Sequence, residues 1–254
     1  MMKIKIPTDK GNIAAVVNEP KEKTDRLAIL CPGYLDSKDY DHLKILAEDL
    51  AKEGYTAVRF DPIGTWESDG DISDYTTTEY LKDVETVLNY MLKQNDFKNI
   101  LIGGHSRGGK ISMLYAAKDK RIKKIIAIMP SSVVHMFDDE RIKAARETGF
   151  SVSKRDLPDD KNLTREFSVP ISHFLDNKKY TILPVLNKIK APLIIIAGEL
   201  DQLEPPKDVK IIFDNANQPK KYILIKGVGH DYRKSKEEIR QVNNELLKAL
   251  NFIN

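Results

Sequence analysis

Six short apolar runs with almost no polar alternation are the feature of this 254-residue chain that most restricts its fold. Strands that are apolar on both faces belong to parallel sheets covered by helices on both sides. Several stretches between the runs carry apolar residues at the 3.6-residue period of an amphipathic helix. This alternation predicts an α/β fold with an open, mostly parallel sheet and helices on both faces. The runs are Leu27–Cys31, Ala57–Phe60, Ile100–Ile102, Ile125–Met129, Leu193–Ala197 and Tyr222–Ile225.

Local signals place the remaining elements around these runs. Residues 3–6 and 12–18 predict an opening hairpin that turns at Asp9-Lys10-Gly11-Asn12. Helical periodicity covers residues 43–50, 81–91 and 111–115, and a last helix is expected over about 234–250. Gly54 stands where the first helix would end, and Thr76-x-x-Glu79 is a candidate capping box for the second.

One long segment interrupts the strand–helix rhythm. Roughly 60 residues between Met129 and Pro192 contain no clear sheet strand, which is too long for a structureless loop inside a compact domain. We therefore expect residues 132–187 to form a cap insertion packed over one edge of the sheet, with residues 1–131 and 188–254 as the core. A surface excursion without a functional role is the alternative.

The insertion supplies the candidate substrate-binding residues. It leaves the sheet at a carboxyl end, where ligands of open α/β sheets bind, and it returns just before another strand. Its apolar side chains have no sheet face to cover, so some are expected to line an acyl or aryl pocket. Packing onto the core is the competing fate of each of them. The candidates are Phe137, Phe174 and Tyr180, with Met136 and Phe167 as further apolar members.

The most specific catalytic signal is the run Ile100–Gly109, which contains G-x-S-x-G between an apolar strand and a helix. This context is the one that a nucleophile elbow requires. The turn forces Ser106 into a strained conformation that is tolerated when Gly104 and Gly108 lack side chains. The helix that follows favours negative charge at its N-terminus. Ser106 is thus predicted to be a nucleophile.

A serine hydroxyl needs a base to take its proton, and five histidines compete for that role. They are His42, His105, His135, His173 and His230. His105 is fixed inside the elbow and is expected to point away from Ser106, while His42 belongs to the first helix, which is expected to lie on an outer face. His135 and His173 belong to the insertion. His230 lies on a glycine-rich loop after the last strand, which makes it the predicted base.

The base in turn needs a carboxylate that fixes its tautomer. The loop after Leu193–Ala197 offers Glu199, Asp201 and Glu204. Asp201 lies in mid-loop and has the reach, whereas Glu199 is close to the strand end and Glu204 adjoins Pro205. The chain order Ser106, Asp201, His230 is that of an α/β-hydrolase.

A tetrahedral intermediate needs two backbone N–H donors. Arg107, the residue after the nucleophile, supplies one of them. The second is expected from the loop after Leu27–Cys31, where Pro32 has no N–H and Gly33 permits a sharp turn. Tyr34 is thus the predicted second donor.

Composition excludes several other classes. There are 41 Lys and Arg against 38 Asp and Glu, with both signs mixed along the chain, so no nucleic-acid partner is expected. The single cysteine, Cys31, cannot form an internal disulfide and lies in an apolar strand, where packing is its usual role. No signal peptide or membrane-inserting segment is visible, so we expect a cytoplasmic protein. No metal or nucleotide motif is present, and no cofactor is expected.

Taken together, these motifs resemble the α/β-hydrolase superfamily, in particular its esterase/lipase and serine-aminopeptidase-like group. The arrangement is similar to small bacterial acyl esterases of the cinnamoyl/feruloyl type and to monoacylglycerol-lipase-like enzymes. Pro32-Gly33-Tyr34 resembles the His-Gly-aromatic oxyanion loop of the family, and residues 61–68 resemble its Asp-x-Arg-Gly-x-Gly-x-Ser loop. Three positions depart from the pattern: Pro32 replaces a histidine, Ile63 an arginine and Trp66 a glycine.

The resemblance and the motifs lead to one expected activity with several alternatives. We expect a serine hydrolase that cleaves short-to-medium acyl or aryl carboxylic esters through an acyl-enzyme intermediate. The partner is then a small-molecule ester, and the sequence leaves a homodimer open. An aminopeptidase, an amidase or a thioesterase of the same fold is the nearest alternative. A non-catalytic binding protein is a further one, although such proteins normally lack a triad member.

Overall fold

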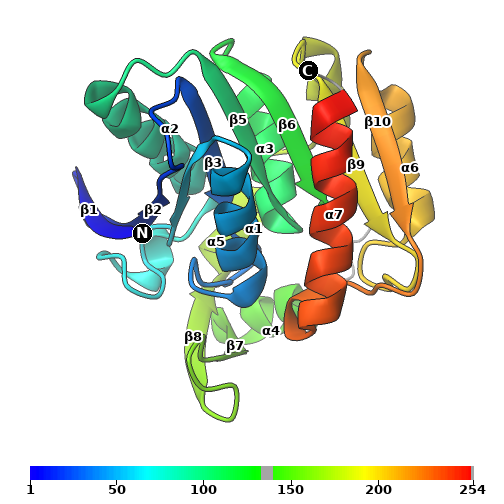
Figure 1. Cartoon of the computed structure of the whole chain (residues 1–254). Coiled ribbons are helices and arrows are strands. Elements are labelled where there is room, and N and C mark those ends of the chain that lie inside the picture. Colours follow the sequence, from blue (N-terminus) through cyan, green and yellow to red (C-terminus); the bar gives the residue numbers. More distant parts are fainter. Residues whose placement is uncertain (133–139, 253–254) are drawn as a thin grey trace.

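The computed structural model describes residues 1–132 and 140–252, and its centre is an eight-stranded sheet (Figure 1). The strand order is β1-β2-β4-β3-β5-β6-β9-β10. β1 and β2 form an antiparallel hairpin, β2 is antiparallel to β4, and all other neighbours are parallel. The mostly parallel α/β sheet predicted from the apolar runs is confirmed. The strands are β1 (Met2–Thr8), β2 (Gly11–Asn18), β3 (Arg26–Cys31), β4 (Thr56–Phe60), β5 (Asn99–His105), β6 (Ile122–Ile128), β9 (Leu193–Gly198) and β10 (Lys220–Ile225).

Helices cover both faces of this sheet (Figure 1). α1 (Asp41–Lys52) and α7 (Lys236–Phe252) pack on one face through a core that includes Leu46 and Val242. On the opposite face lie α2 (Thr77–Gln94), α3 (Arg107–Ala116) and α6 (Pro206–Asn215). Two apolar cores on either side of the sheet explain why its central strands have no polar face.

The helix ends follow the sequence signals in most respects. Gly54 has a φ of +85° directly after α1, and its N–H donates to the Ala51 carbonyl, as expected of a residue that ends a helix. At the start of α2 the Thr76 hydroxyl accepts from the Glu79 N–H at 3.1 Å. The Glu79 carboxylate instead forms an ion pair with Lys10, so this capping box is only half formed.

The segment between β6 and β9 contains a strand pair that the sequence analysis did not predict. β7 (Phe150–Asp156) and β8 (Thr164–Pro170) form a separate antiparallel hairpin. The sequence pattern does not reveal which face of β7 is buried, because Ser151 is buried while the neighbouring Phe150 and Val152 are 43% and 50% exposed. The remaining described elements of the segment are α4 (Glu140–Thr148), α5 (Ile171–Asn177) and the short 3-10 helix η2 (Leu183–Lys188).

Parallel strands bring their following loops to one edge of the sheet. The loops after β3, β5, β6, β9 and β10 therefore meet, and the hairpin β7–β8 with α4 and α5 lies beside this edge (Figure 1). Two short 3-10 helices, η1 (Ile72–Asp74) and η3 (Tyr232–Lys234), belong to the same region. The residues with predicted catalytic roles all come from these loops.

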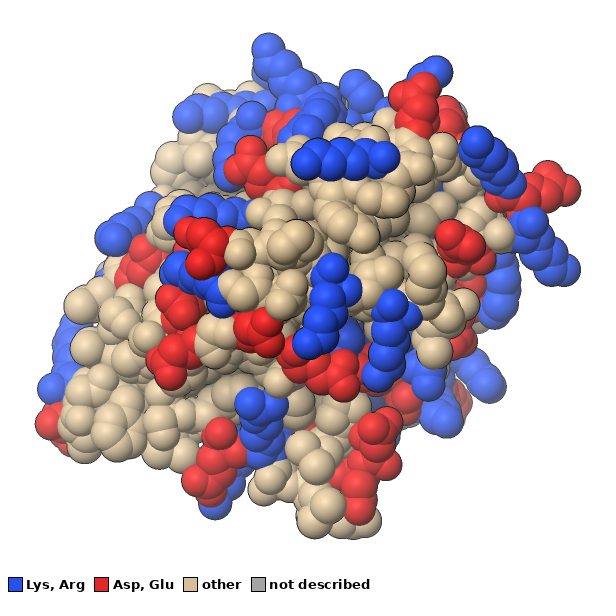
Figure 2. Space-filling view, turned by 90° about the vertical axis from the view of Figure 1, so that its left-hand side faces the viewer, with Lys and Arg blue, Asp and Glu red and all other residues tan. Residues whose placement is uncertain are grey.

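The surface carries charges of both signs. Figure 2 shows Lys and Arg side chains lying among Asp and Glu over the face that it displays. Among the helices of the described ranges, none combines the length and the apolar character that crossing a bilayer requires.

Candidate active site

Ser106 occupies a strained turn between β5 and α3. Its φ of +53° and ψ of −118° are rare for a residue with a side chain, and such strain persists where the surroundings enforce it. Gly104 and Gly108 explain how the turn is possible. A Cβ atom on either glycine would lie 2.2 Å or 1.9 Å from the Cys31 carbonyl oxygen, so neither position can hold a larger residue. The elbow therefore packs backbone to backbone against the end of β3.

Three side chains from three loops form a continuous hydrogen-bonded chain. The Ser106 Oγ atom lies 3.0 Å from Nε2 of His230, and Nδ1 of His230 lies 2.8 Å from Oδ2 of Asp201. The Asp201 carboxylate is fully buried, and its other oxygen accepts N–H groups from Leu203 at 3.0 Å and Glu204 at 2.8 Å. The acid is thereby fixed in place, and it in turn fixes the orientation of the imidazole.

The two competing acids of the same loop serve other contacts. Glu199 accepts the Gly227 N–H at 2.9 Å and thereby ties the loop after β9 to the loop after β10. Glu204 accepts the Ser132 N–H at 2.7 Å, and burial raises the pKa of its carboxyl group. The structure places Asp201, and neither glutamate, on His230.

None of the other described histidines forms a hydrogen bond with the Ser106 hydroxyl. His42 is 1% exposed, because the first turn of α1 packs its ring against His105 and Tyr232. Burial lowers the pKa of His42 to about 3. His173 is also buried and hydrogen-bonds the Tyr75 carbonyl. His135 lies outside the described residues.

Asp36, His42 and His105 form a buried cluster that the sequence did not reveal. Their side-chain ligand atoms lie within 4.8 Å of one another. Arg233 already supplies a positive charge, with its Nε 4.0 Å from the Asp36 carboxylate. Despite burial, His105 and Arg155 hold the pKa of Asp36 well below its usual range. The negative charge of Asp36 is thus compensated by cations of the protein. Asp36 and His105 of this cluster line the cavity next to Ser106.

The two predicted backbone donors face the same cavity. Tyr34 and Arg107 both line it next to Ser106, and the N–H of neither residue finds an acceptor within the described part of the chain. The loop that carries Tyr34 is held from both sides, because the Leu35 N–H donates to the Tyr75 hydroxyl at 2.9 Å and Arg155 donates to the Tyr34 carbonyl. Such preorganised donors can stabilise an oxyanion.

The cavity itself has a volume of about 550 Å³ and opens between the sheet edge and the segment 140–178. Of the predicted pocket residues, Phe174 lines it. Tyr180 lies outside its lining, with its hydroxyl 2.7 Å from Thr78 Oγ1 at the start of α2. Phe167 packs on Trp66, with ring centroids 5.4 Å apart. Phe137 and Met136 lie outside the described residues.

Sequence reasoning missed the charged groups of this cavity. Among the described residues, six Lys and Arg line it together with four Asp and Glu. Arg233 follows His230 closely in the sequence and forms two hydrogen bonds with Asp156 of β7, at 2.9 Å and 2.7 Å. The position of Arg233 three residues after His230 is the one sequence signal that could have identified it. The basic residues are Arg107, Lys110, Arg141, Arg155, Lys178 and Arg233, and the acidic ones are Asp36, Glu140, Glu204 and Asp231.

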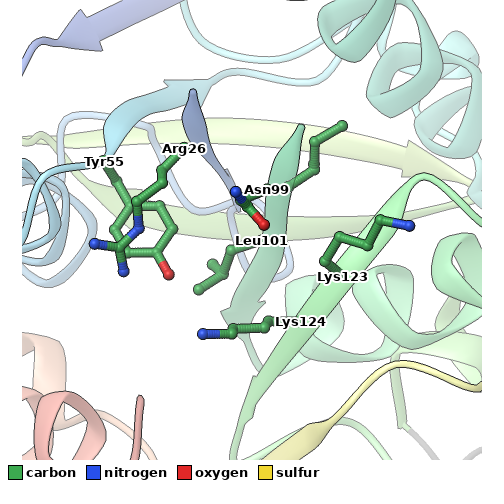
Figure 3. A pocket seen from close by; sticks show the side chains of 7 residues that line it. Arg26, Tyr55, Asn99, Leu101, Lys123 and Lys124 are labelled. Carbon is green, nitrogen blue, oxygen red and sulfur yellow. The ribbon is translucent and has the colours of Figure 1, made fainter. Parts of the chain in front are cut away.

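A second, smaller cavity of about 260 Å³ lies at the amino ends of the strands (Figure 3). Arg26 stacks there over the ring of Tyr55, with its guanidinium carbon 4.0 Å from the ring centroid. Lys123 and Lys124 line the same hollow. Because the amino ends of the strands lie opposite to the carboxyl ends that carry Ser106, this smaller cavity is separate from the candidate active site.

Comparison with known proteins agrees with this architecture. A family model described as the alpha/beta hydrolase fold matches residues 28–149. A polyketide transferase from Penicillium sp. is 24% identical, with 83% of each chain covered. The mitochondrial palmitoyl-protein thioesterase ABHD10 of Mus musculus is also 24% identical, over 83% of this chain and 70% of its own length. The solved structure of Est1E from Butyrivibrio proteoclasticus with bound ferulic acid superimposes with a TM-score of 0.77 at 22% identity, covering 98% of both chains.

The order of the strands, the elbow and these similarities together identify the fold. The chain has the α/β-hydrolase fold, and a palmitoyl-protein thioesterase is among the proteins that its sequence resembles.

Proposed function

We propose that this protein is a serine hydrolase that cleaves carboxylic esters through an acyl-enzyme intermediate. The observation that carries the proposal is the hydrogen-bonded chain from Ser106 through His230 to Asp201, which opens into the cavity. A base at 3.0 Å from the hydroxyl is within the range needed for proton transfer. No cofactor is required for this chemistry.

In the first half of the reaction the Ser106 oxygen forms a bond to the carbonyl carbon while His230 accepts its proton. The negative charge that develops on the carbonyl oxygen is stabilised by the N–H groups of Tyr34 and Arg107. Collapse of the intermediate breaks the bond to the alcohol oxygen, which takes the proton from His230. The serine is left acylated, and the alcohol departs.

In the second half a water molecule repeats the sequence. His230 takes a proton from the water as its oxygen attacks the acyl carbon, and returns the proton to Ser106 when the acid leaves. Asp201 stays ionised and stabilises the imidazolium in both halves. The four hydrogen bonds around Asp201 and His230 supply the preorganisation that this role needs.

A thioester is the second candidate substrate. The similarity to a palmitoyl-protein thioesterase favours it, because thioester and ester cleavage use the same nucleophile, base and oxyanion donors. An aminopeptidase reading has less support, since an N-terminal ammonium group would meet a cavity whose described lining has six cationic residues and four carboxylates.

The test is a substrate panel with purified protein. It contains 4-nitrophenyl esters of increasing acyl length, hydroxycinnamate esters, acyl thioesters and aminoacyl 4-nitroanilides. Ester hydrolysis that disappears in Ser106→Ala is the expected result. Hydrolysis of the anilides alone would replace the ester proposal with a peptidase, and turnover that survives in pure Ser106→Ala would remove the serine from the mechanism.

A further inference from the structure

The arginine that follows the nucleophile has a charge that the described protein does not balance. The Arg107 side chain is 5% exposed, yet no carboxylate within residues 1–132 and 140–252 forms an ion pair with it. Its Nε and Nη1 atoms are buried without a hydrogen-bond partner, and its Nη2 makes one long bond of 3.4 Å to Thr77. Buried cations are normally paired, because removing the charge from water is costly.

The surroundings of Arg107 hold the guanidinium in place without neutralising it. Its carbon lies 4.2 Å from the ring centroid of Tyr75 and 5.5 Å from that of Tyr80. Such contacts with aromatic faces offset part of the cost of burial and fix the plane of the group. They leave the charge itself in place, in a residue that lines the cavity together with Ser106.

A second cation stands at the same end of the cavity. Lys110, one helical turn along α3, is 3% exposed and donates to Asn177 Oδ1 at 2.9 Å. Burial and the neighbouring positive charge of Arg107 lower the pKa of Lys110 to about 8. The negative charge of Glu204 opposes this lowering of the Lys110 pKa, but the Glu204 carboxylate is itself bound to the Ser132 N–H at 2.7 Å. A second cationic side chain therefore lies close to Arg107 in the lining of the cavity.

We propose that Arg107 binds an anionic group, a carboxylate or an equivalent oxyanion, carried by the substrate beside its ester bond. A carboxylate matches the planar guanidinium with two parallel hydrogen bonds, which is the geometry that arginine favours. The inference rests on the proposed hydrolase function, because it places the anion on the molecule that Ser106 attacks. Because Arg107 and Ser106 line the same cavity, the anion and the ester bond can belong to one bound molecule.

Matched ester pairs test the proposal. Mono-4-nitrophenyl glutarate and its methyl ester differ only by a carboxylate on the acyl side. The esters 4-acetoxybenzoate and methyl 4-acetoxybenzoate differ by a carboxylate on the alcohol side. We expect kcat/KM to favour the anionic member of at least one pair, and Arg107→Met to reduce that ratio about 10- to 100-fold, the range of a charge-assisted hydrogen bond. The pair that responds identifies the side that carries the anion.

Arg26→Met is the matched control. Arg26 also stacks on a tyrosine, but at the other end of the sheet (Figure 3). Its removal takes the same charge from the protein and should leave both substrate ratios unchanged. Ratios near one in the wild type, or ratios that Arg107→Met leaves alone, would overturn the proposal.

A binding measurement separates this proposal from the hydrolase itself. Calorimetry on Ser106→Ala with benzoate, benzamide and inorganic phosphate needs no turnover. Benzoate or phosphate should bind at least about tenfold more tightly than benzamide, and the comparison of the two anions distinguishes a carboxylate from a phosphate. Equal affinity for benzoate, phosphate and benzamide, or no binding by any of them, overturns the anion site even if esters are hydrolysed. Arginine-dependent binding without any ester turnover would instead keep the site and remove the proposed function.

Discussion

The Nζ atom of Lys38 lies 3.0 Å from Oδ2 of Asp61, and the two side chains are 1% and 0% exposed. The Lys38 N–H also donates to the other carboxylate oxygen at 2.7 Å. Burial raises the pKa of Asp61 to about 6, against the opposing effect of the lysine charge. The pair joins the loop after β3, which carries Tyr34, to the loop after β4. The donor loop is thus anchored by a buried ion pair.

Lys38→Met is expected to destabilise the protein by about 3–5 kcal/mol, because the Asp61 carboxylate would remain buried without its cation. Urea denaturation measures the change in the free energy of unfolding. The double variant Lys38→Met/Asp61→Asn should recover part of the loss, since it removes the stranded charge as well.

Lys52→Met provides the control for this effect. Lys52 pairs with Asp49 at a similar distance of 2.9 Å, but its side chain is 74% exposed. Its loss should cost less than about 1 kcal/mol. Equal losses in the free energy of unfolding for the two lysine substitutions would show that burial of the Lys38–Asp61 pair does not increase the cost of breaking it.

Substitutions in the catalytic chain are expected to distinguish the three acids of the β9 loop. Asp201→Asn should lower kcat about 10⁴-fold by favouring the wrong tautomer of His230. Glu199→Gln and Glu204→Gln should have small effects, because their amide oxygens can still accept the Gly227 and Ser132 N–H groups. Steady-state kinetics on the best ester of the panel measures all three. A severe loss in either glutamine variant with a mild one in Asp201→Asn would reassign the acid.

Removal of the nucleophile or the base should be more severe. Ser106→Ala and His230→Ala are each expected to lower kcat by about 10⁴- to 10⁶-fold, because the two residues act as one unit. The double variant should be no worse than either single one. Additive losses would indicate that the residues act independently.

The parts of the fold that the sequence predicted have a common physical origin. Runs such as Leu193–Ala197 are buried on both faces, so apolarity alone revealed them. The elbow was readable because Gly104 and Gly108 must be glycines for steric reasons that hold for any sequence at that turn. The order of the motifs along the chain then indicated which loops meet.

The missed features depend on packing between distant segments. In β7 the exposed positions include Phe150 and Val152 and the buried one is Ser151, so the alternation of apolar and polar residues does not mark the buried face. His42 is buried because Tyr232, from the far end of the chain, covers it. The Arg107 guanidinium is held in place by Tyr75 and Thr77, which come from another part of the chain. No local pattern encodes these contacts.

Buried histidines should make the protein less stable in mild acid. Burial lowers the pKa of His42 to about 3, whereas in the unfolded chain it is near 6.5. The unfolded state therefore binds the proton more readily, so stability is full above about pH 6.5 and is lost as the pH falls towards 3. From about pH 7.5 to about pH 5.0 the loss from His42 is about 2 kcal/mol.

Urea denaturation at those two pH values, on wild type and His42→Leu, measures this contribution. The drop in the free energy of unfolding should be about 2 kcal/mol smaller in the variant. The comparison is internal to each protein, so any general cost of the substitution cancels. Equal drops would mean that His42 titrates normally in the folded state.

Phe174 and Phe167 are expected to differ in what they control, although both belong to the predicted cap and are buried. Phe174 lines the cavity, so Phe174→Ala should change the ratio of kcat/KM between a bulky aryl ester and a small acetyl ester. Phe167 packs against Trp66 outside the lining, so Phe167→Ala should cost about 3–5 kcal/mol of stability and leave that ratio within about twofold. Parallel measurement of both ratios and both unfolding free energies decides the matter. If the Phe167 variant moved the ratio and the Phe174 variant did not, the substrate would occupy a different part of the cap.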